Sequence, residues 1–109
     1  MKRTLAALVA VGIAVAATAH ADSDDDRYVQ ILHAGGIGLD APRTVLIQLG
    51  HKICGFFDDG LTFDNIVTFI ERAGEQGNIS ELIDPIGAKF TIDTAVDIYC
   101  PQYRSKLTG

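Results

Sequence analysis

Residues 42–60 of this 109-residue chain read PRTVLIQLGHKICGFFDDG, a pattern that predicts a long amphipathic helix. At about 100° per residue, the polar and small side chains gather on one side of the helix. The apolar ones cover an arc of about 200°, wider than a surface helix needs; they are Val45, Leu46, Ile47, Leu49, Ile53, Cys54, Phe56 and Phe57. We therefore expect this helix to be the central one, with the other helices packed on it. Gly60 is expected to end it as a left-handed cap.

Two further helices are predicted on either side of this segment. An acidic start leads to apolar residues at helical spacing, so a first helix is expected from about Asp24 to Ala34, ended by Gly35-Gly36. Thr62 is the expected N-cap of a third helix that ends near Gly77. A turn is expected to follow it.

A fourth helix is predicted to begin at Asp84-Pro85, an N-cap followed by proline at the first helical position, and to be closed by Pro101. No segment alternates apolar and polar residues as a half-buried strand does. The predicted fold class is therefore all-α, a compact array of about four short helices with one disulfide.

Phe90 does not fit the fourth helix well, because it falls on the polar side with Asp93 and Asp97. One interpretation is that it marks an exposed contact surface. The interpretation we favour is that the helix begins later, which would leave Phe90 in a turn and free to reach the core.

The first residues carry the three-part pattern of a secretory signal. Lys2 and Arg3 precede an apolar run over residues 5–17, and Ala19-His20-Ala21 supplies the small residues that a signal peptidase reads. The run is shorter than the roughly 20 apolar residues that span a bilayer. We expect cleavage before Asp22, a single mature domain over residues 22–109, no membrane anchor after cleavage, and a location outside the cell or in a periplasm-like envelope space.

Export to an oxidising compartment favours a disulfide between Cys54 and Cys100, since they are the only two cysteines. Export also changes the charge. The formal charge of −5 becomes −7 once Lys2 and Arg3 leave with the signal. So acidic a chain without a basic stripe repels nucleic acid and anionic lipid, and neither is expected as a partner.

No motif in the chain predicts catalysis or metal binding. Gly35, Gly36 and Gly38 follow a helix rather than a strand, so they indicate a helix stop and a connection, not a phosphate loop. His33 and His51 both fall on polar sides and lack a second ligand one turn away, so we interpret them as solvent-exposed and expect neither metal nor haem. The acidic residues 22–26 lack the spacing of a calcium loop. We therefore predict no catalytic residue, no cofactor and no enzyme activity.

Four short stretches resemble a known family. They are the acidic start leading to Tyr28, the segment Leu32-His33-Ala34-Gly35-Gly36-Ile37, residues 54–60, and the closing Ala95 to Tyr99-Cys100-Pro101. Together they make the chain similar to the small secreted mycobacterial proteins grouped as domain of unknown function 732 (DUF732). The resemblance implies a helical secreted fold with one disulfide, and it implies no activity.

Two functions stay open on these grounds. The first hypothesis is a non-enzymatic protein-interaction module with an unidentified protein partner. The alternative is a carrier of a small apolar ligand such as haem or lipid, with Phe56, Phe57 and Phe63 lining a cavity. An internal pocket of a few hundred Å³ would favour the carrier, whereas an exposed apolar patch would favour the interaction module.

Overall fold

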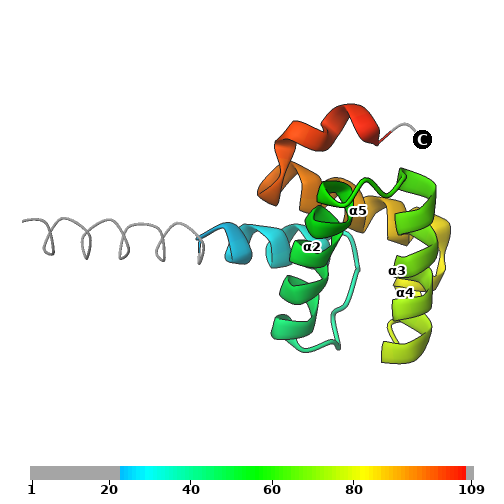
Figure 1. Ribbon diagram of the computed structural model, residues 1–109. Coiled ribbons are helices and arrows are strands. Elements are labelled where there is room, and N and C mark those ends of the chain that lie inside the picture. Colours follow the sequence, from blue (N-terminus) through cyan, green and yellow to red (C-terminus); the bar gives the residue numbers. More distant parts are fainter. Residues whose placement is uncertain (1–22, 108–109) are drawn as a thin grey trace, which may run out of the picture.

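The computed structural model describes residues 23–107, which form an all-helical array with no strand among them (Figure 1). Its elements are a helix over residues 23–34, α2 (Arg43–Asp58), α3 (Phe63–Gly77), the short α4 (Ser80–Ile83), α5 (Pro85–Tyr99) and the 3-10 helix η1 (Pro101–Lys106). The predicted fold class is confirmed, including a disulfide between Cys54 and Cys100. The predicted signal segment and its cleavage site before Asp22 lie outside the described residues.

Local side-chain and backbone chemistry sets the ends of the long helices, as the sequence predicted. The Thr62 hydroxyl accepts the backbone N–H of Asn65 at 3.2 Å and caps α3. The Asp84 carboxylate accepts the N–H of Ile86 at 2.9 Å and caps α5. Gly60 has a φ of 86°, the left-handed conformation that a residue with a Cβ rarely adopts.

The central helix is α5 and not α2, which corrects the prediction from the sequence. It packs against α2, α3, α4 and η1. Residues all around it are buried, namely Gly87, Ala88, Thr91, Ile92, Thr94, Ala95 and Val96, whereas Val45 on the apolar arc of α2 is 41% exposed. Small side chains let several neighbours approach α5 closely at once, and a criterion based on large apolar side chains does not detect this.

Two threonines lie inside this packed core without leaving a polar group unpaired. The Thr91 hydroxyl donates to the carbonyl of Gly87 at 2.9 Å, and that of Thr94 donates to Phe90 at 2.8 Å. Each donates to the residue four positions earlier in its own helix, which satisfies a buried hydroxyl locally.

Phe90 lies inside α5, so the interpretation that this helix begins later is wrong. Its ring is half-buried and packs against Gly35 at the end of the first helix, where an added Cβ would come within 2.6 Å of the ring. A glycine in the connection therefore makes room for an aromatic side chain that the helical pattern placed in solvent.

The helix α4 is an addition to the predicted elements. Asn78 ends α3 in the left-handed conformation, with a φ of 57°, and a single helical turn follows. Leu82 in this turn is fully buried. Four residues are too few to show a helical period, so the sequence indicated only a turn here.

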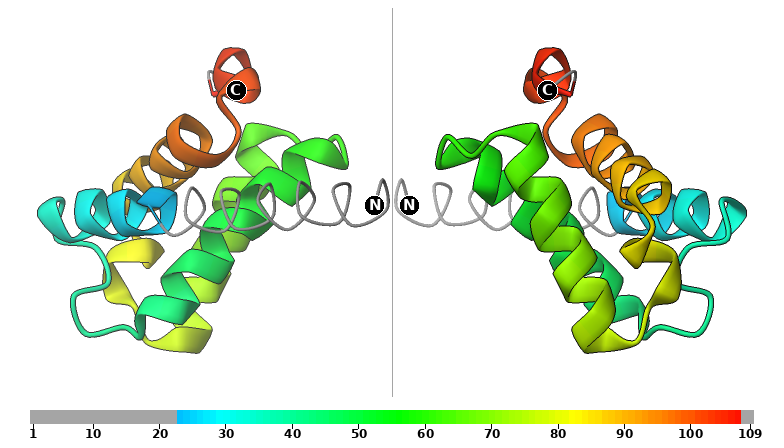
Figure 2. Two further views of the ribbon diagram at one scale, coloured as in Figure 1. Left: turned by 90° about the vertical axis from the view of Figure 1, so that its left-hand side faces the viewer. Right: turned by 90° about the vertical axis from the view of Figure 1, so that its right-hand side faces the viewer.

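The two consecutive helices α2 and α3 pack on different partners. α2 packs mainly on α5, and α3 packs mainly on α4, whereas α2 and α3 contact one another little. In Figure 2 these two helices run as neighbours, with the helix over residues 23–34 and α5 to one side of them.

The C-terminal η1 returns to the end of α2, where Tyr103 stacks on Phe57 and its hydroxyl donates to Asp58. None of the helices over residues 23–107 has the length and apolarity needed to cross a membrane.

Candidate interaction site

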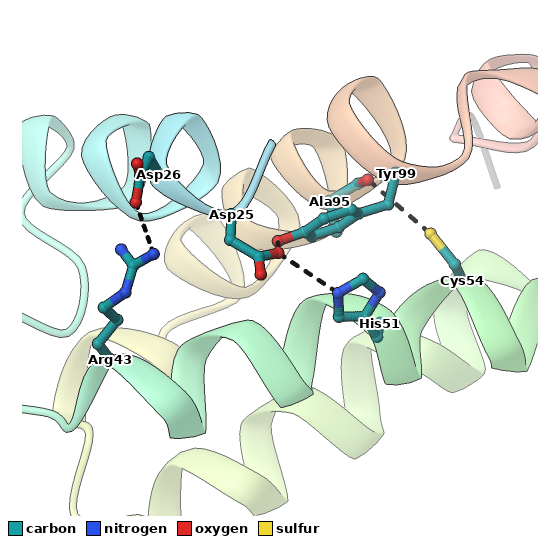
Figure 3. Close-up of polar contacts among 7 residues, drawn as sticks. All are labelled: Asp25, Asp26, Arg43, His51, Cys54, Ala95 and Tyr99. Atoms are coloured by element: carbon teal, nitrogen blue, oxygen red, sulfur yellow. Dashed lines mark hydrogen bonds and ion pairs between the residues drawn. The ribbon is translucent and has the colours of Figure 1, made fainter. Parts of the chain in front are cut away.

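A polar cluster joins the first helix to α2 and α5 (Figure 3). The hydroxyl of Tyr99 donates to the carboxylate of Asp25 at 2.5 Å, and Nε2 of His51 lies 3.4 Å from the same oxygen. The rings of His51 and Tyr99 lie with their centroids 4.1 Å apart. Burial, followed by the hydrogen bond to Asp25, raises the pKa of Tyr99 well above its usual value. The Tyr99 hydroxyl therefore stays protonated and acts as a donor.

The cluster sits over a close crossing of three elements at Gly50. A Cβ at this position would lie 2.8 Å from Cζ of Tyr28 and 2.9 Å from Cε2 of Tyr99. Tyr28 is fully buried; its hydroxyl has no hydrogen-bond partner among the described residues, and burial raises its pKa. The arrangement anchors the first helix, and the grooves described below contain none of these residues.

The two histidines singled out in the sequence lie apart and differ in environment. The side chain of His51 is 56% exposed, as predicted, although it also pairs with Asp25. His33 is half-buried, and its Nε2 is buried without a partner among the described residues, so the prediction of a solvent-exposed side chain is wrong for it. Within residues 23–107 no group of three His, Cys, Asp or Glu side chains is placed to hold a metal ion.

The disulfide lies directly beside the polar cluster. It joins Cys54 in α2 to Cys100 at the end of α5, with the two Cα atoms 6.0 Å apart. The sulfur of Cys54 lies 3.8 Å from the carbonyl oxygen of Ala95 (Figure 3). This is a packing contact, because a disulfide sulfur carries no proton to donate. The bond holds α2 to the central helix.

An open apolar groove lies between α2 and α3, where these helices separate. Its volume is about 240 Å³. One wall comes from α2, the other from α3, and the floor from Ile79 and Leu82; the wall residues are Val45, Gln48, Leu49 and Lys52 on α2, and Phe69, Ala73 and Gly77 on α3. The groove stays open because α2 packs mainly on α5 and α3 packs mainly on α4, so that α2 and α3 contact one another little.

The groove is not built from the phenylalanines that the sequence suggested as cavity liners. Phe57 and Phe63 are buried in the core, and Phe56 packs edge-on against Phe69 at 4.6 Å between ring centroids. Phe69 is the aromatic residue of the groove, with the ammonium group of Lys52 5.7 Å from its ring centre. At about 100° per residue Phe69 falls on the apolar face of α3, but this pattern carries no sign that α2 stands away from it.

Two other grooves flank the connection over residues 35–42. One has a volume of about 170 Å³ and is lined in part by Gly38 and Glu81. The Glu81 carboxylate accepts hydrogen bonds from the N–H of Gly38 at 2.9 Å and from the hydroxyl of Ser80 at 2.7 Å. The Ser80 hydroxyl, then the Gly38 N–H, lowers the pKa of Glu81. The other, of about 310 Å³, lies beside Ile86, which is 78% exposed.

Comparison with known proteins agrees with the resemblance noted in the sequence. The profile of the family described as "Protein of unknown function (DUF732)" matches residues 24–102. The chain belongs to the DUF732 family. The match covers the helix over residues 23–34 except its first residue, α2 to α5 in full, both cysteines and all the residues that line the groove between α2 and α3.

Relatives of this DUF732 protein come from mycobacteria and are themselves described as uncharacterized. Over 103 residues the chain is 30% identical to "Uncharacterized protein Rv1271c" of Mycobacterium tuberculosis and to "Uncharacterized protein Mb1302c" of Mycobacterium bovis. The alignment covers 94% of this chain and 84% of each relative. No solved structure matches the DUF732 chain.

Proposed function

We propose that this DUF732 protein is an exported, non-enzymatic protein-interaction module that binds its partner in the groove between α2 and α3. The observation that carries the proposal is the groove itself, in which Val45 is exposed and Phe69 and Ala73 are partly exposed between two helices that pack on α5 and α4. A surface groove between two helices, with apolar side chains in its walls, is the form in which amphipathic partner helices dock.

The dimensions of the groove suit a helix from a partner protein. Phe69 and Gly77 lie eight residues apart on α3, which corresponds to about 12 Å of helix. Apolar side chains at positions i, i+3 or i+4, and i+7 of a docked helix span about the same length. Ala73 and Gly77 have small side chains or none, so the backbone of a docked helix can approach the α3 wall closely.

A carrier of haem or lipid is the second candidate, and the form of the groove supports it less. Small-molecule pockets enclose about 300–1,000 Å³ and bury most of their ligand. The groove here is smaller, at about 240 Å³, and open to solvent along its length. His51 points to Asp25 and does not line the groove, which leaves no histidine there for haem iron.

Site-specific photo-crosslinking in the producing cells tests the docking proposal. A photoreactive residue at Gln48, in the groove wall, is expected to give one adduct of defined mass whose partner peptide mass spectrometry identifies. The same residue at Ile86, which is 78% exposed and does not line the groove, is the matched control and is expected to give none. Protein recovered from culture fluid for this experiment is expected to begin at Asp22.

A second substitution links any adduct to the groove. Val45→Glu places a charge in the wall at a side chain that is already 41% exposed, so the fold should tolerate it. The Gln48 adduct is expected to disappear in this variant. Equal adducts at Gln48 and Ile86, or an adduct that survives Val45→Glu, would contradict docking in the groove, and an adduct with a lipid mass would favour the carrier.

A further inference from the structure

We infer that the occupant of this groove is an acidic amphipathic helix, whose apolar face lies on the floor and whose carboxylates contact Lys52 and Arg72. The inference rests on the proposed docking function and adds the chemistry of the partner. It is drawn from the placement of the positive charges in an otherwise acidic chain.

The arginines away from the groove are each neutralised by an aspartate. Arg27 pairs with Asp24 at 3.3 Å, Arg43 with Asp26 at 2.6 Å, and Arg104 with Asp97 at 2.8 Å. Six residues are used in these three pairs, all of them on the surface. Lys89 and Lys106 also lie away from the groove and form no ion pair with the described residues, so the matching of positive charge holds for these arginines and not for the lysines.

The cations beside the groove are different. Lys52 lines it, and its ammonium group lies over the ring of Phe69, 5.7 Å from the ring centre. Arg72 follows Phe69 by three residues and precedes Ala73, so helical register places it on the outer edge of the α3 wall. Neither Lys52 nor Arg72 forms an ion pair with any residue in the part of the chain that the structure describes.

The groove thus has an apolar floor, the unpaired Lys52 in its α2 wall, and the unpaired Arg72 next to its α3 wall in helical register. A helix with apolar side chains on one face and carboxylates flanking them matches that pattern from both sides. A single fatty-acid carboxylate would match only one of the two cations. The rest of the chain is acidic, with a formal charge of −7 after signal removal. The two cations beside the groove therefore favour a partner helix that carries carboxylates over one that carries positive charge.

Nuclear magnetic resonance with defined peptides tests the inference. The protein is residues 22–109 with the disulfide intact, labelled with ¹⁵N. The probes are two synthetic helical peptides with the same three leucines at i, i+4 and i+7, one flanked by glutamates and the other by lysines. The acidic peptide is expected to shift the amide resonances of the groove residues on α2 and α3 and to bind about tenfold more tightly than the basic one.

Charge reversal supplies the decisive variant. Lys52→Glu with Arg72→Glu is expected to reverse the preference, so that the basic peptide binds more tightly. Lys89→Glu with Lys106→Glu makes the same change in net charge at two exposed lysines outside the groove, and it should keep the preference for the acidic peptide. Measuring both variants separates a local effect from the overall charge of the protein.

The possible outcomes separate the inference from the function on which it rests. Equal binding of both peptides in the groove would overturn the acidic partner and leave the docking function standing. Acidic-peptide binding that shifts residues outside the groove, or no binding by either peptide, would also overturn the inference, while the crosslinking experiment still decides the function. Groove shifts on adding sodium decanoate, with none from either peptide, would overturn both in favour of an apolar-ligand carrier.

Discussion

Gly87 is the residue on which the contact between α4 and α5 depends. A Cβ at this position would lie 1.8 Å from the carbonyl oxygen of Glu81, a backbone atom that cannot move independently. In the sequence, Gly87 is an unfavourable residue near the start of a helix. In the fold, its missing side chain allows α4 to fold back against α5. Gly87 therefore serves packing at the expense of helix propensity.

Replacing Gly87 by alanine is expected to destabilise the protein by about 2 kcal/mol or more, because α4 must shift to make room for the methyl group. The matched control is Gly55→Ala in the interior of α2, where an added Cβ meets no atom within 4 Å. That change should stabilise the protein by about 0.5–1 kcal/mol through helix propensity. Urea unfolding followed by circular dichroism measures both; a Gly87→Ala variant as stable as the parent would show that α4 is free to move.

At the scale of the elements, the sequence predicted what depends on local chemistry and missed what depends on packing. Thr62 and Asp84 predicted the starts of α3 and α5 correctly, because a capping side chain accepts a backbone N–H only two or three residues further along the chain. The central place of α5 came from small side chains, which a pattern of large apolar residues does not reveal. The contact of Phe90 with Gly35 joins two elements far apart in sequence, and helical periodicity carries no information on such pairs.

The connection over residues 35–42 supplies the prediction at this scale, because the carboxylate of Glu81 holds it to α4 through the N–H of Gly38. The hydrogen bonds lower the pKa of Glu81 in the folded state below its ordinary value of 4.5. Its contribution to stability is therefore fully present above about pH 5 and is lost as the pH falls through the folded-state pKa. Glu81→Gln should cost about 0.5–1 kcal/mol at pH 7, a value reduced for partial exposure.

The stability difference between the parent and Glu81→Gln should then shrink as the pH is lowered from 5 towards 3. Urea unfolding at a series of pH values measures it. The control is Glu75→Gln, at an exposed side chain that makes no hydrogen bond or ion pair with the described residues, and it should show no such trend. A Glu81→Gln difference that is constant down to pH 3 would argue against the carboxylate as the group that holds the connection.

At the scale of the whole molecule, the groove arises from how α2 and α3 are held. Only a short connection through Gly60 joins them, and each packs mainly on a different partner. No single segment of the sequence contains this information. Considered one helix at a time, Val45 falls on the apolar arc of α2, Lys52 on its polar side, and Phe69 on the apolar face of α3. Their meeting across a groove follows from the positions of α4 and α5, so the candidate site could not be predicted from the sequence, whereas the disulfide could.

The disulfide is the tie that fixes α2 to α5, and we expect folding to depend on it. Cys54 and Cys100 are separated by 46 residues in the chain. On the chain-entropy model, closing a loop of that size stabilises the folded state by about 4 kcal/mol. The total stability of native domains is only about 5–15 kcal/mol, so the bond accounts for a large share, and loss of a native disulfide from a small secreted domain often abolishes folding at 37 °C. The Cys54→Ser, Cys100→Ser double variant is therefore expected to be largely unfolded at 37 °C.

Thermal unfolding followed by circular dichroism, with and without reductant, measures this dependence. Reductant should lower the melting temperature of the parent to that of the double variant and leave the double variant unchanged, which separates loss of the bond from any effect of the serines. Because α2 forms one wall of the groove, loss of the bond should also abolish the amide shifts caused by the acidic peptide. A double variant that melts within a few degrees of the parent and still binds the peptide would mean that packing of α2 on α5 holds the groove without the disulfide.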